Sequence, residues 1–470
     1  MPLLGSRGAA SLTGFGGLAK LGYLLRNSLR FRRSNSAYLN RTPASAGNRQ
    51  TWTWSGWVKR GQLGIANAGL FGALSGSESF DLVYEGNVGA TADSLRFVYY
   101  NGSALNGNLV TTALYRDPSA WYHIVAVWNT TDATSSNRMR LYVNGNEITS
   151  FSASSYPTQN TSALINNTVA HTLGRYYNTT SYFDGYLGEI NFIDGQALTP
   201  SSFGRTDNAT GQWVPKKFGG AYGTNGFYLP FTNTTSTSTL GNDFSGNGNT
   251  WTVNNISLTA GATYDSMTDV PTLTSETTAN YCVLNTLDGT NMGYLTVSNA
   301  NLTYSASANA NGWRAIRGTI GVTTGKYRFS VYGTIGASTR MQLGLCTSAT
   351  DLGGYNVSQN IGVQYNPYDA DVSVNGSATS YGSTQRITAV FDFIFDASTG
   401  KCWVAVNGTL LGGNPDAGTG QMATFTTTSP VFPVTQAYGS SWDVNFGQRP
   451  WDYTISTASG FKSLNTYNLP

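Results

Sequence analysis

The chain has 470 residues, of which 11% are charged, and it contains 55 glycines, 28 tyrosines and 11 tryptophans. At this length two or three domains are expected, because one β-sandwich core rarely organises more than ~200–250 residues. The abundance of glycine, aromatic residues, Ser, Thr and Asn excludes a mainly helical protein and favours antiparallel strands joined by many turns.

Charge is distributed unevenly along the chain. The first 60 residues contain ten of the 27 Lys and Arg residues and none of the 24 Asp and Glu residues. We therefore expect residues 1–34 to form a basic arm that docks on an acidic partner, and a merely solvated basic tail is the alternative. The predicted docking residues are the basic ones of this arm: Arg7, Lys20, Arg26, Arg30, Arg32 and Arg33.

The same arm has no apolar stretch near the ~20 residues that cross a bilayer, so no membrane span is expected. Its composition, rich in Arg and Ser and free of acidic residues, also resembles an organellar transit peptide. Nothing else in the chain indicates an organellar enzyme, and the docking arm is the preferred interpretation.

Three cysteines are an odd number and define no disulfide framework. All of them, Cys282, Cys346 and Cys402, lie in the C-terminal half, and the last two fall within apolar strand patterns. We expect buried free thiols.

The first predicted sandwich covers residues 35–205. A short edge strand is expected over residues 34–42, and the run 51–58 places Trp52 and Trp54 on one face of a strand. Residues 121–129 alternate with a period of two, which indicates a strand covered on both faces. The next run ends in Asn144-Gly145, a pair that accepts positive φ at both central positions of a type I′ hairpin turn.

Four motifs of this region carry a family resemblance. In chain order they are Trp-x-Trp-x-x-Trp-Val (52–58), Trp-Tyr-His-Ile-Val-Ala-Val (121–127), Leu-Tyr-Val-Asn-Gly (141–145) and the segment 183–200. Together they resemble the laminin-G-like, concanavalin-A-like jelly roll, in the version found in bacteriophage tail and virion proteins. The resemblance covers about residues 35–205.

Residues 206–270 are expected to form an ordered connector, because their aromatic residues are too many for a free linker. A second sandwich is predicted over residues 271–470. There Phe391, Phe393 and Phe395 share one strand face, and the partner strand closes in Asn407-Gly408. The strand order, with the final Asn-Phe-Gly-Gln-Arg-Pro run, resembles a SPRY-type domain, which implies binding by loops. The predicted fold class is thus all-β: two antiparallel jelly-roll sandwiches in tandem behind a short basic arm.

Catalytic constellations are weak in this sequence. Glu189 and Asp194 are five residues apart and face opposite sides of a strand, whereas glucanases of this fold need paired carboxylates on one face. Asp392 and Asp396 share a face but are expected to lead into a turn. The two histidines, His123 and His171, have no recognisable nucleophile or metal partner. No catalytic residue is therefore predicted.

No cofactor is predicted either. The resemblance to laminin-G-like domains, some of which bind calcium, leaves open a calcium ion held by loop oxygens near Asp184 or Asp194.

Aromatic residues beside amides in the predicted loops suggest ligand contacts. Such residues can stack on sugar rings while amides and carboxylates bond the hydroxyls, although tyrosine also commonly fills sandwich edges and interfaces. The predicted ligand-binding residues are Tyr176, Tyr177, Asn178 and Tyr182 in the first sandwich and Tyr365, Tyr368, Asp369, Tyr438 and Trp442 in the second.

These features favour a non-enzymatic virion protein of a tailed bacteriophage. The first hypothesis is a tail fibre that attaches to other virion proteins by its N-terminus and binds a host-surface glycan or protein, without nucleic acid as a partner. A homo-oligomer, in particular a trimer, is expected from the family. The alternatives are a structural head-decorating fibre or cement protein on the capsid surface and, less favoured, a polysaccharide-degrading enzyme.

Overall fold

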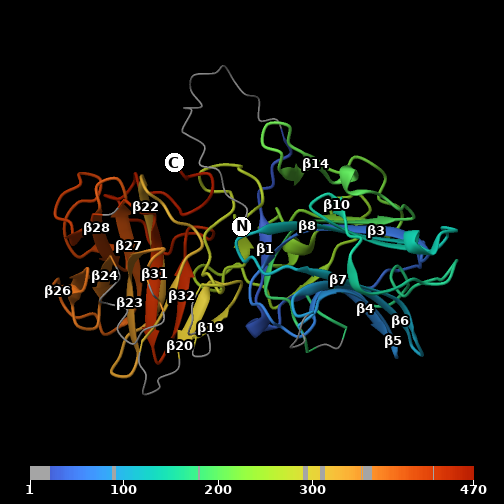
Figure 1. The fold of residues 1–470 in the computed structure, drawn as a ribbon, viewed down its shortest axis with the longest axis horizontal. Coiled ribbons are helices and arrows are strands. Elements are labelled where there is room, and N and C mark those ends of the chain that lie inside the picture. The colour runs from blue at the N-terminus through green and yellow to red at the C-terminus, as the bar shows by residue number, and fades with distance from the viewer. Residues whose placement is uncertain are drawn as a thin grey trace.

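Two β-rich lobes lie side by side, one formed by the blue-to-green half of the chain and the other by the yellow-to-red half (Figure 1). The computed structural model describes residues 22–86, 91–177, 180–288, 295–306, 313–350, 352, 362–426 and 428–470. The predicted fold class, all-β with two antiparallel sandwiches in tandem, is confirmed.

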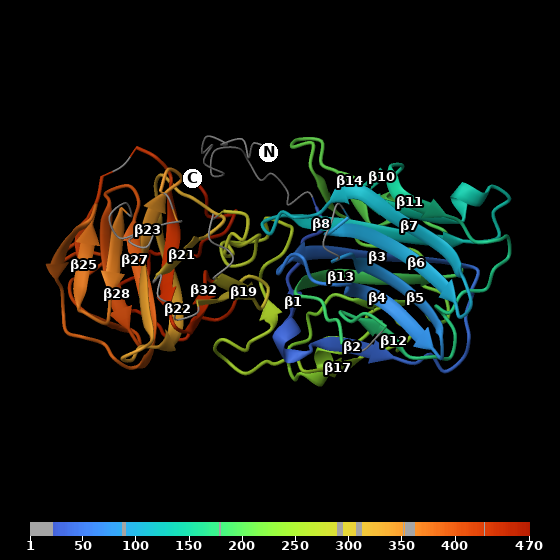
Figure 2. The same cartoon turned by 60° about the horizontal axis from the view of Figure 1, so that its bottom comes forward.

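The first sandwich consists of two antiparallel sheets. Sheet 1 has the order β10 (Asn146–Glu147), β9 (Met139–Val143), β8 (Trp121–Asn129), β3 (Thr51–Arg60), β13 (Gly185–Asp194), β1 (Ser28–Phe31) and β18 (Ser266–Met267), and β16 (Phe227–Leu229) also pairs with β13. Sheet 2 has the order β11 (Phe151–Ser155), β7 (Leu105–Leu114), β6 (Ser94–Asn101), β5 (Glu78–Tyr84), β4 (Ala68–Ser75), β12 (His171–Leu173), β2 (Tyr38–Arg41) and β17 (Thr252–Asn254). Its curved strands face the viewer in Figure 2.

Several short elements lie outside the two sheets of this lobe. They are the 3-10 helices η1 (Arg33–Asn35), η2 (Ser135–Asn137), η3 (Pro200–Ser202) and η4 (Ser238–Gly241), and the two-stranded sheet of β14 (Gly204–Thr206) and β15 (Trp213–Pro215).

The second sandwich is also built from two antiparallel sheets. Sheet 3 has the order β19 (Leu295–Ser298), β20 (Thr303–Ala306), β32 (Ser441–Asn445), β22 (Lys326–Thr334), β27 (Thr388–Asp396), β28 (Lys401–Val406) and β29 (Thr409–Leu410), with β30 (Ala423–Thr424) beside β28. Sheet 4 has the order β21 (Arg314–Arg317), β31 (Val431–Tyr438), β23 (Arg340–Thr347), β24 (Val363–Asn366), β25 (Asp371–Val374) and β26 (Ser377–Ser380).

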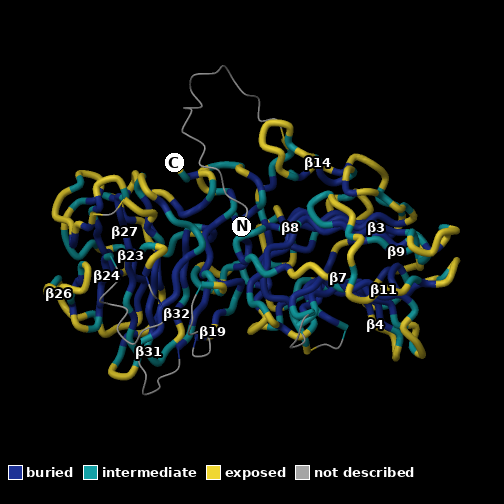
Figure 3. The backbone as a smooth tube through the Cα atoms, viewed as in Figure 1, coloured by how far each residue is buried: buried dark blue, intermediate teal, exposed yellow. Residues whose placement is uncertain are grey.

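The predicted strand faces are confirmed. Trp52, Trp54 and Trp128 point into the core of the first sandwich, while Val125 and Val127 pack into a separate apolar cluster on the other face of sheet 1. In the second sandwich the rings of the Phe391, Phe393 and Phe395 run are fully buried in one core. Removing one such ring typically lowers stability by about 3–5 kcal/mol. Figure 3 shows these cores as continuous buried segments inside exposed loops.

Both predicted Asn-Gly hairpins are present and have the same geometry. Asn144 and Asn407 adopt φ of 50° and 46°, and the glycine that follows each of them also has positive φ. The backbone N–H of Asn144 donates to the His123 carbonyl. The side-chain Oδ1 of Asn144 accepts from the backbone N–H of His123 at 2.8 Å. Asn407 makes the same pair of bonds with Val390, at 2.9 and 3.0 Å. Each asparagine thus joins its turn by two hydrogen bonds to the neighbouring strand, β8 for Asn144 and β27 for Asn407.

The predicted boundaries at residues 34 and 270 need correction. β1, inside the predicted arm, pairs with β13 and β18 of sheet 1. The connector 206–270 is ordered, but it is not a separate spacer, because β16, β17 and β18 all join the first sandwich. β17 also covers β2, so the strand expected at the sheet edge is an interior strand. Strand pairing over more than 200 residues was not visible in local patterns.

The three cysteines are buried free thiols, as predicted. Burial raises the pKa of the Cys282 thiol to about 11 and that of Cys346 to about 12. In the described part of the chain, no helix has the length and apolar character needed to cross a membrane.

Candidate functional site

The contact between the two sandwiches is a buried polar junction. The ammonium of Lys59, on β3, is fully buried and donates to Asp269 Oδ2 at 2.7 Å, to Asn280 Oδ1 at 2.8 Å and to the Tyr281 carbonyl at 2.8 Å. Trp121 Nε1 donates to the other oxygen of Asp269 at 3.0 Å. Since the ammonium is completely paired, it is a structural link and not a free binding group.

A second set of contacts joins the same surfaces. The carboxylate of Asp184, in the first sandwich, accepts backbone N–H bonds from Asn299 at 3.0 Å and Ala300 at 2.7 Å in the second. Tyr186 donates its hydroxyl proton to the Ala300 carbonyl at 3.1 Å. Apolar side chains of both sandwiches also share one core cluster across the junction. The two lobes are therefore held in one arrangement.

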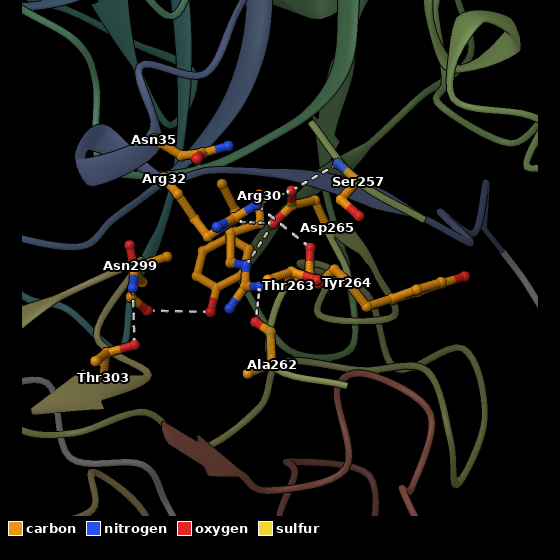
Figure 4. Close-up of polar contacts among 12 residues, drawn as sticks. Arg30, Arg32, Asn35, Ser257, Ala262, Thr263, Tyr264, Asp265, Asn299 and Thr303 are labelled. Carbon is orange, nitrogen blue, oxygen red and sulfur yellow. Dashed lines mark hydrogen bonds and ion pairs between the residues drawn. The ribbon is translucent and has the colours of Figure 1, made fainter. Parts of the chain in front are cut away.

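The predicted docking residues separate into buried and exposed groups. Arg30 and Arg32 are 1% and 8% exposed, and both donate to Asp265 Oδ1 at 2.9 Å (Figure 4). Arg30 also donates to the Ala262 and Tyr264 carbonyls. The prediction that these two residues dock on a partner is therefore wrong, because their charges neutralise an internal carboxylate 233–235 residues away. Arg26 and Arg33 are exposed, whereas Arg7 and Lys20 lie outside the described residues.

Glu189 is the most unusual carboxylate of the first sandwich. It is buried at a bulge of β13 with a φ of 53°, a strained conformation for this residue. The Tyr228 hydroxyl donates to its Oε2 at 2.9 Å, and the Tyr23 hydroxyl lies 2.5 Å from that of Tyr228. Burial raises the pKa of Glu189 from its ordinary 4.5 to about 7, although the tyrosine bonds and Lys217 oppose the shift.

The members of the two candidate carboxylate pairs have different surroundings. Asp194, the predicted neighbour of Glu189, accepts backbone N–H bonds from Asn48 at 2.8 Å and Asn225 at 3.0 Å. Asp392 is buried with its pKa raised to about 7, chiefly by desolvation, whereas Asp396 caps the turn after β27 through Ser398 N–H at 2.9 Å. Both oxygens of Asp392 lack hydrogen-bond partners among the described residues, and its Oδ1 lies 3.5 Å from Arg328 Nη2.

The histidines are held as neutral structural rings. Trp213 Nε1 donates to His123 Nδ1 at 3.0 Å, so Nε2 carries the proton and donates to Ser55 Oγ at 2.9 Å. His123 cannot then take a proton from that serine. Burial lowers its pKa to about 3 and that of His171 to about 4. His171 Nε2 accepts from Asn166 N–H at 2.9 Å.

The carboxylates considered for calcium are occupied by N–H donors. Asp184 accepts four backbone N–H bonds, from Arg33, Gln62 and the two junction residues Asn299 and Ala300. Asp194 accepts backbone N–H bonds from Asn48 and Asn225 and a side-chain bond from Asn166 Nδ2. Donor hydrogens at these oxygens would repel a cation, so the structure does not support calcium at either place. Within the described residues there is also no cluster of three or more His, Cys, Asp or Glu side chains suited to a metal.

The aromatic loop of the first sandwich packs on its own sheet. Tyr176 is 8% exposed and contacts Tyr177, which is half-buried, with ring centroids 4.3 Å apart. Tyr182, also half-buried, lies 6.1 Å from the Tyr38 ring. Asn178 is outside the described residues. Tyr176 has therefore lost most of the surface that a sugar ring would need, while Tyr177 and Tyr182 keep a part of theirs.

Two of the predicted aromatic contacts in the second sandwich are core residues. Tyr365 and Trp442 are fully buried in the core shared by sheets 3 and 4, so the prediction that they stack on a ligand is wrong. Their strands alternate in and out, and the register places both on the inward face. From the sequence alone the two faces of a strand covered on both sides look alike.

Of the remaining predicted residues, Tyr438 lies on the outward face of sheet 4, whereas Tyr368 and Asp369 lie in the loop between β24 and β25, where Tyr368 packs against the core shared by sheets 3 and 4. The half-buried Tyr368 ring has the Arg340 guanidinium 4.0 Å from its centroid and the Arg386 guanidinium at the same distance. Asp369 is exposed and accepts from Asn366 Nδ2 at 2.9 Å. Tyr438 is half-buried, pairs in register with Arg340 and lies 6.3 Å from the Trp313 ring.

Sequence reasoning missed the amides beside these residues. Gln364 and Gln436 are 2% and 1% exposed, and Gln342 is half-buried, yet in the described structure Gln364 lacks hydrogen-bond partners for both polar atoms, Gln436 for Nε2 and Gln342 for Oε1. Gln342 and Gln436 are direct cross-strand neighbours, and Gln364 lies opposite Gly344 on the next strand. We call the outward side of sheet 4 around Gln342, Gln364, Gln436, Arg340 and Tyr438 the amide face, and Tyr368 and Arg386 border it through Arg340. The signal was alternation: Arg340-x-Gln342 and Gln436-x-Tyr438 place polar residues at every second position.

A family model described as the concanavalin A-like lectin/glucanases superfamily matches residues 33–202. The first sandwich is therefore a laminin-G-like, concanavalin-A-like jelly-roll domain, as predicted. A search of curated proteins found no match. The SPRY resemblance of the second sandwich stays a prediction.

Several solved structures are similar to the chain. A candidate carbohydrate-binding protein from Bacteroides ovatus ATCC 8483 shares 16% identity over 49% of this chain and 59% of its own, with a TM-score of 0.34. Laminin α1 domains LG4-5 of mouse share 11% identity over 94% of this chain and 87% of their own, with a TM-score of 0.30. A heptameric SAP-like pentraxin from Limulus polyphemus shares 14% over 38% and 80%, with a TM-score of 0.28. Likenesses of this size identify no ligand.

Proposed function

We propose that this chain is a glycan-binding protein without enzymatic activity. The observation that carries the proposal is the half-buried Gln342 of the amide face, whose Oε1 finds no partner among the described residues and which lies opposite the buried amide of Gln436. A buried unpaired amide costs about 1–3 kcal/mol, which a ligand with both donors and acceptors can offset. Sugar hydroxyls supply both in one group. The match of residues 33–202 to a family of lectins and glucanases supports the same class of ligand.

Binding without cleavage is favoured by the placement of the acidic residues. Retaining glycosidases hold two carboxyl groups about 5–5.5 Å apart on either side of the scissile bond. Here Asp194 and Asp396 accept backbone N–H bonds at local turns or loops, and Glu189 is held by Tyr228. The amide face itself contributes amides, aromatic rings and arginines.

The role in which we place this activity is that of a bacteriophage tail fibre that adsorbs to the host surface. This part of the proposal rests on the resemblance of residues 35–205 to phage virion proteins. Attachment to other virion proteins would use basic residues outside the buried pair Arg30 and Arg32, namely Arg7, Lys20, Arg26 and Arg33. Assembly as a homo-oligomer, with a trimer preferred, would add weak sugar contacts through effective concentration.

The test of the glycan proposal uses the purified full-length chain on an array of bacterial-surface and other glycans. Binding to a defined subset, with no release of reducing sugar from the bound polysaccharide, is expected. Absence of binding across the array would reject the glycan ligand, and release of reducing ends would reject the non-enzymatic role. Locating the chain in electron micrographs of intact particles distinguishes a tail fibre from a head-decorating fibre or cement protein.

A further inference from the structure

We propose that the amide face binds an acidic saccharide, a sugar ring that carries a carboxylate or sulfate group. This inference rests on the proposed glycan function and specifies the class of glycan. It follows from Arg340, which shares a strand face with the amides, and from Arg386, which lies against the same Tyr368 ring.

The cations have unusual surroundings. Arg340 and Arg386 lie 4.0 Å from the same Tyr368 ring, and in the described part of the chain no acidic side chain forms an ion pair with either of them. Arg340 Nε is buried without an acceptor, and Arg386 is exposed. Stacking on a ring fixes a guanidinium plane and leaves its N–H edge available. That edge matches the paired oxygens of a carboxylate or sulfate.

The amides lie next to this edge. Arg340 and Gln342 are two residues apart on β23 and therefore share a face, and their cross-strand partners are Tyr438 and Gln436. A Cβ at Gly344 would clash with the Val363 carbonyl, so no side chain can stand between Gln342 and Cys346 on that face. An acid group at Arg340 thus places the hydroxyls of the same ring beside Gln342, which is half-buried, while its neighbour Gln436 is covered by the chain.

A nearby aromatic pair provides the apolar contact that a sugar ring needs. The rings of Tyr438 and Trp313, both half-buried, lie 6.3 Å apart and tilted by 47°. Carbohydrate C–H faces pack on such rings. Tyr368, which sequence reasoning proposed for stacking, cannot do this, because cations occupy its ring.

The charge of the surroundings limits the ligand to a sparsely charged one. Asp369 is exposed beside Tyr368, and Asp371 on β25 lies close enough to Asp369 for burial and that neighbour to raise its pKa. These carboxylates would repel a polyanion such as a nucleic acid. One acid group per ring, followed by uncharged hydroxyls, fits two cations bordered by amides.

The experiment compares polysaccharides that differ only in their acid groups. The full-length chain is titrated with polygalacturonate and its fully methyl-esterified form, and with dextran sulfate and dextran, and is applied to an array of acidic and neutral glycans. We expect binding confined to acidic glycans and weakened by salt. Equal binding to acidic and neutral glycans overturns the acidic specificity but leaves the glycan function intact. Binding to nothing overturns both.

Two arginine variants and a matched control locate the site. R340Q and R386Q should each weaken binding to the best acidic glycan about tenfold or more, because each loses a charge-assisted hydrogen bond. K216Q removes an exposed cation of the first lobe that has no proposed binding role, and should bind as the unchanged chain does. Thermal unfolding confirms that each variant folds, and for R386Q the exposed position makes this the expected result. Unchanged affinity of folded R386Q and R340Q would overturn the proposal.

Discussion

The junction between the sandwiches and the amide face of sheet 4 both bury polar side chains, and they differ in how far these side chains are paired. Lys59 has three acceptors and Asp184 has four N–H donors, whereas Gln364 has no partner in the described structure. Burial of polar groups is tolerated in the junction because both surfaces fold together and complement each other. On the amide face, no described residue supplies a hydrogen-bond partner for the unpaired atoms of the glutamines.

The comparison teaches that the number of buried polar groups in a region does not predict how mutation will affect it, and that the partners of each group must be known as well. A paired buried charge resists removal and fixes geometry. An unpaired buried amide lowers the stability of the free protein and favours binding of a ligand that supplies the missing hydrogen bonds. The two regions should therefore respond in opposite ways to loss of their polar groups.

The largest expected effect is in the junction. D269A leaves the Lys59 ammonium buried without its counter-charge and removes the acceptor of Trp121 Nε1. We expect the free energy of unfolding to fall by about 3–5 kcal/mol, as measured by denaturant unfolding. E276A breaks the exposed pair with Lys462 and should cost less than about 1 kcal/mol. Similar losses in both variants would contradict the structural importance of the junction.

Glu189 provides a pH-dependent test within the first sandwich. Its folded pKa of about 7 exceeds the ordinary 4.5, so the native state holds the proton more tightly. The contribution of this group to stability is full below pH 4.5 and is lost as the pH rises through about 7. E189Q keeps an acceptor for the Tyr228 hydroxyl without the charge.

The E189Q variant should therefore match the unchanged chain near pH 4.5 and exceed its stability at pH 8 by a few kcal/mol, on the order of 3. Denaturant unfolding at both pH values measures the difference. The same offset at both pH values would mean that Glu189 does not titrate in this range.

Two glutamines of the second sandwich allow a direct test of how the hydrogen bonds of a buried amide affect stability. Gln448 is fully buried, its Oε1 accepts from Phe446 N–H at 2.8 Å and its Nε2 donates to the Cys282 carbonyl at 3.4 Å. Q448M should lower stability by about 1–3 kcal/mol, because it orphans the Phe446 N–H. Q364M should instead raise the stability of the free protein by about 1 kcal/mol, because no hydrogen bond is lost. Thermal and denaturant unfolding under one condition measures the stability of both variants. A clear loss of stability in Q364M would show that the Gln364 amide is paired.

The smallest expected effect is a difference in stability between asparagine variants in the hairpin turns. N144A and N407A lose positive-φ tolerance and also the side-chain acceptor for a strand N–H, so each should cost about 1–2 kcal/mol. Asn375, at φ 47° before Gly376, is the matched control, since among the described contacts its side chain accepts no such bond. N375A should cost clearly less. Equal losses at all three positions would assign the whole effect to backbone strain.

The strands and hairpins were predictable because their causes are local. Alternation every second residue identified β8 and the Phe391–Phe395 run, and Asn-Gly identified the turns at residues 144 and 407, where positive φ is required. The jelly-roll class of the first sandwich followed from the order of such motifs. Free buried cysteines followed from their number and apolar neighbours.

The candidate site was predictable only in part. Tyr368, Asp369 and Tyr438 were singled out because loop aromatics beside amides are a compositional signal, and their part in ligand binding stays a prediction. The glutamines were not found, since whether an amide has a partner depends on strands that are distant in sequence. Trp442 and Tyr365 were assigned to the surface for the same reason.

The sequence by itself determined the class of fold, the positions of the main strands and the tight turns, because side-chain period and φ preferences act over a few residues. Only the tertiary structure decided which face of each strand is inward and which charges meet. Arg30 and Arg32 look like a basic arm until Asp265 is brought to within 2.9 Å of both. Pairing of this kind, across more than 200 residues, depends on packing between sheets, which no local pattern records.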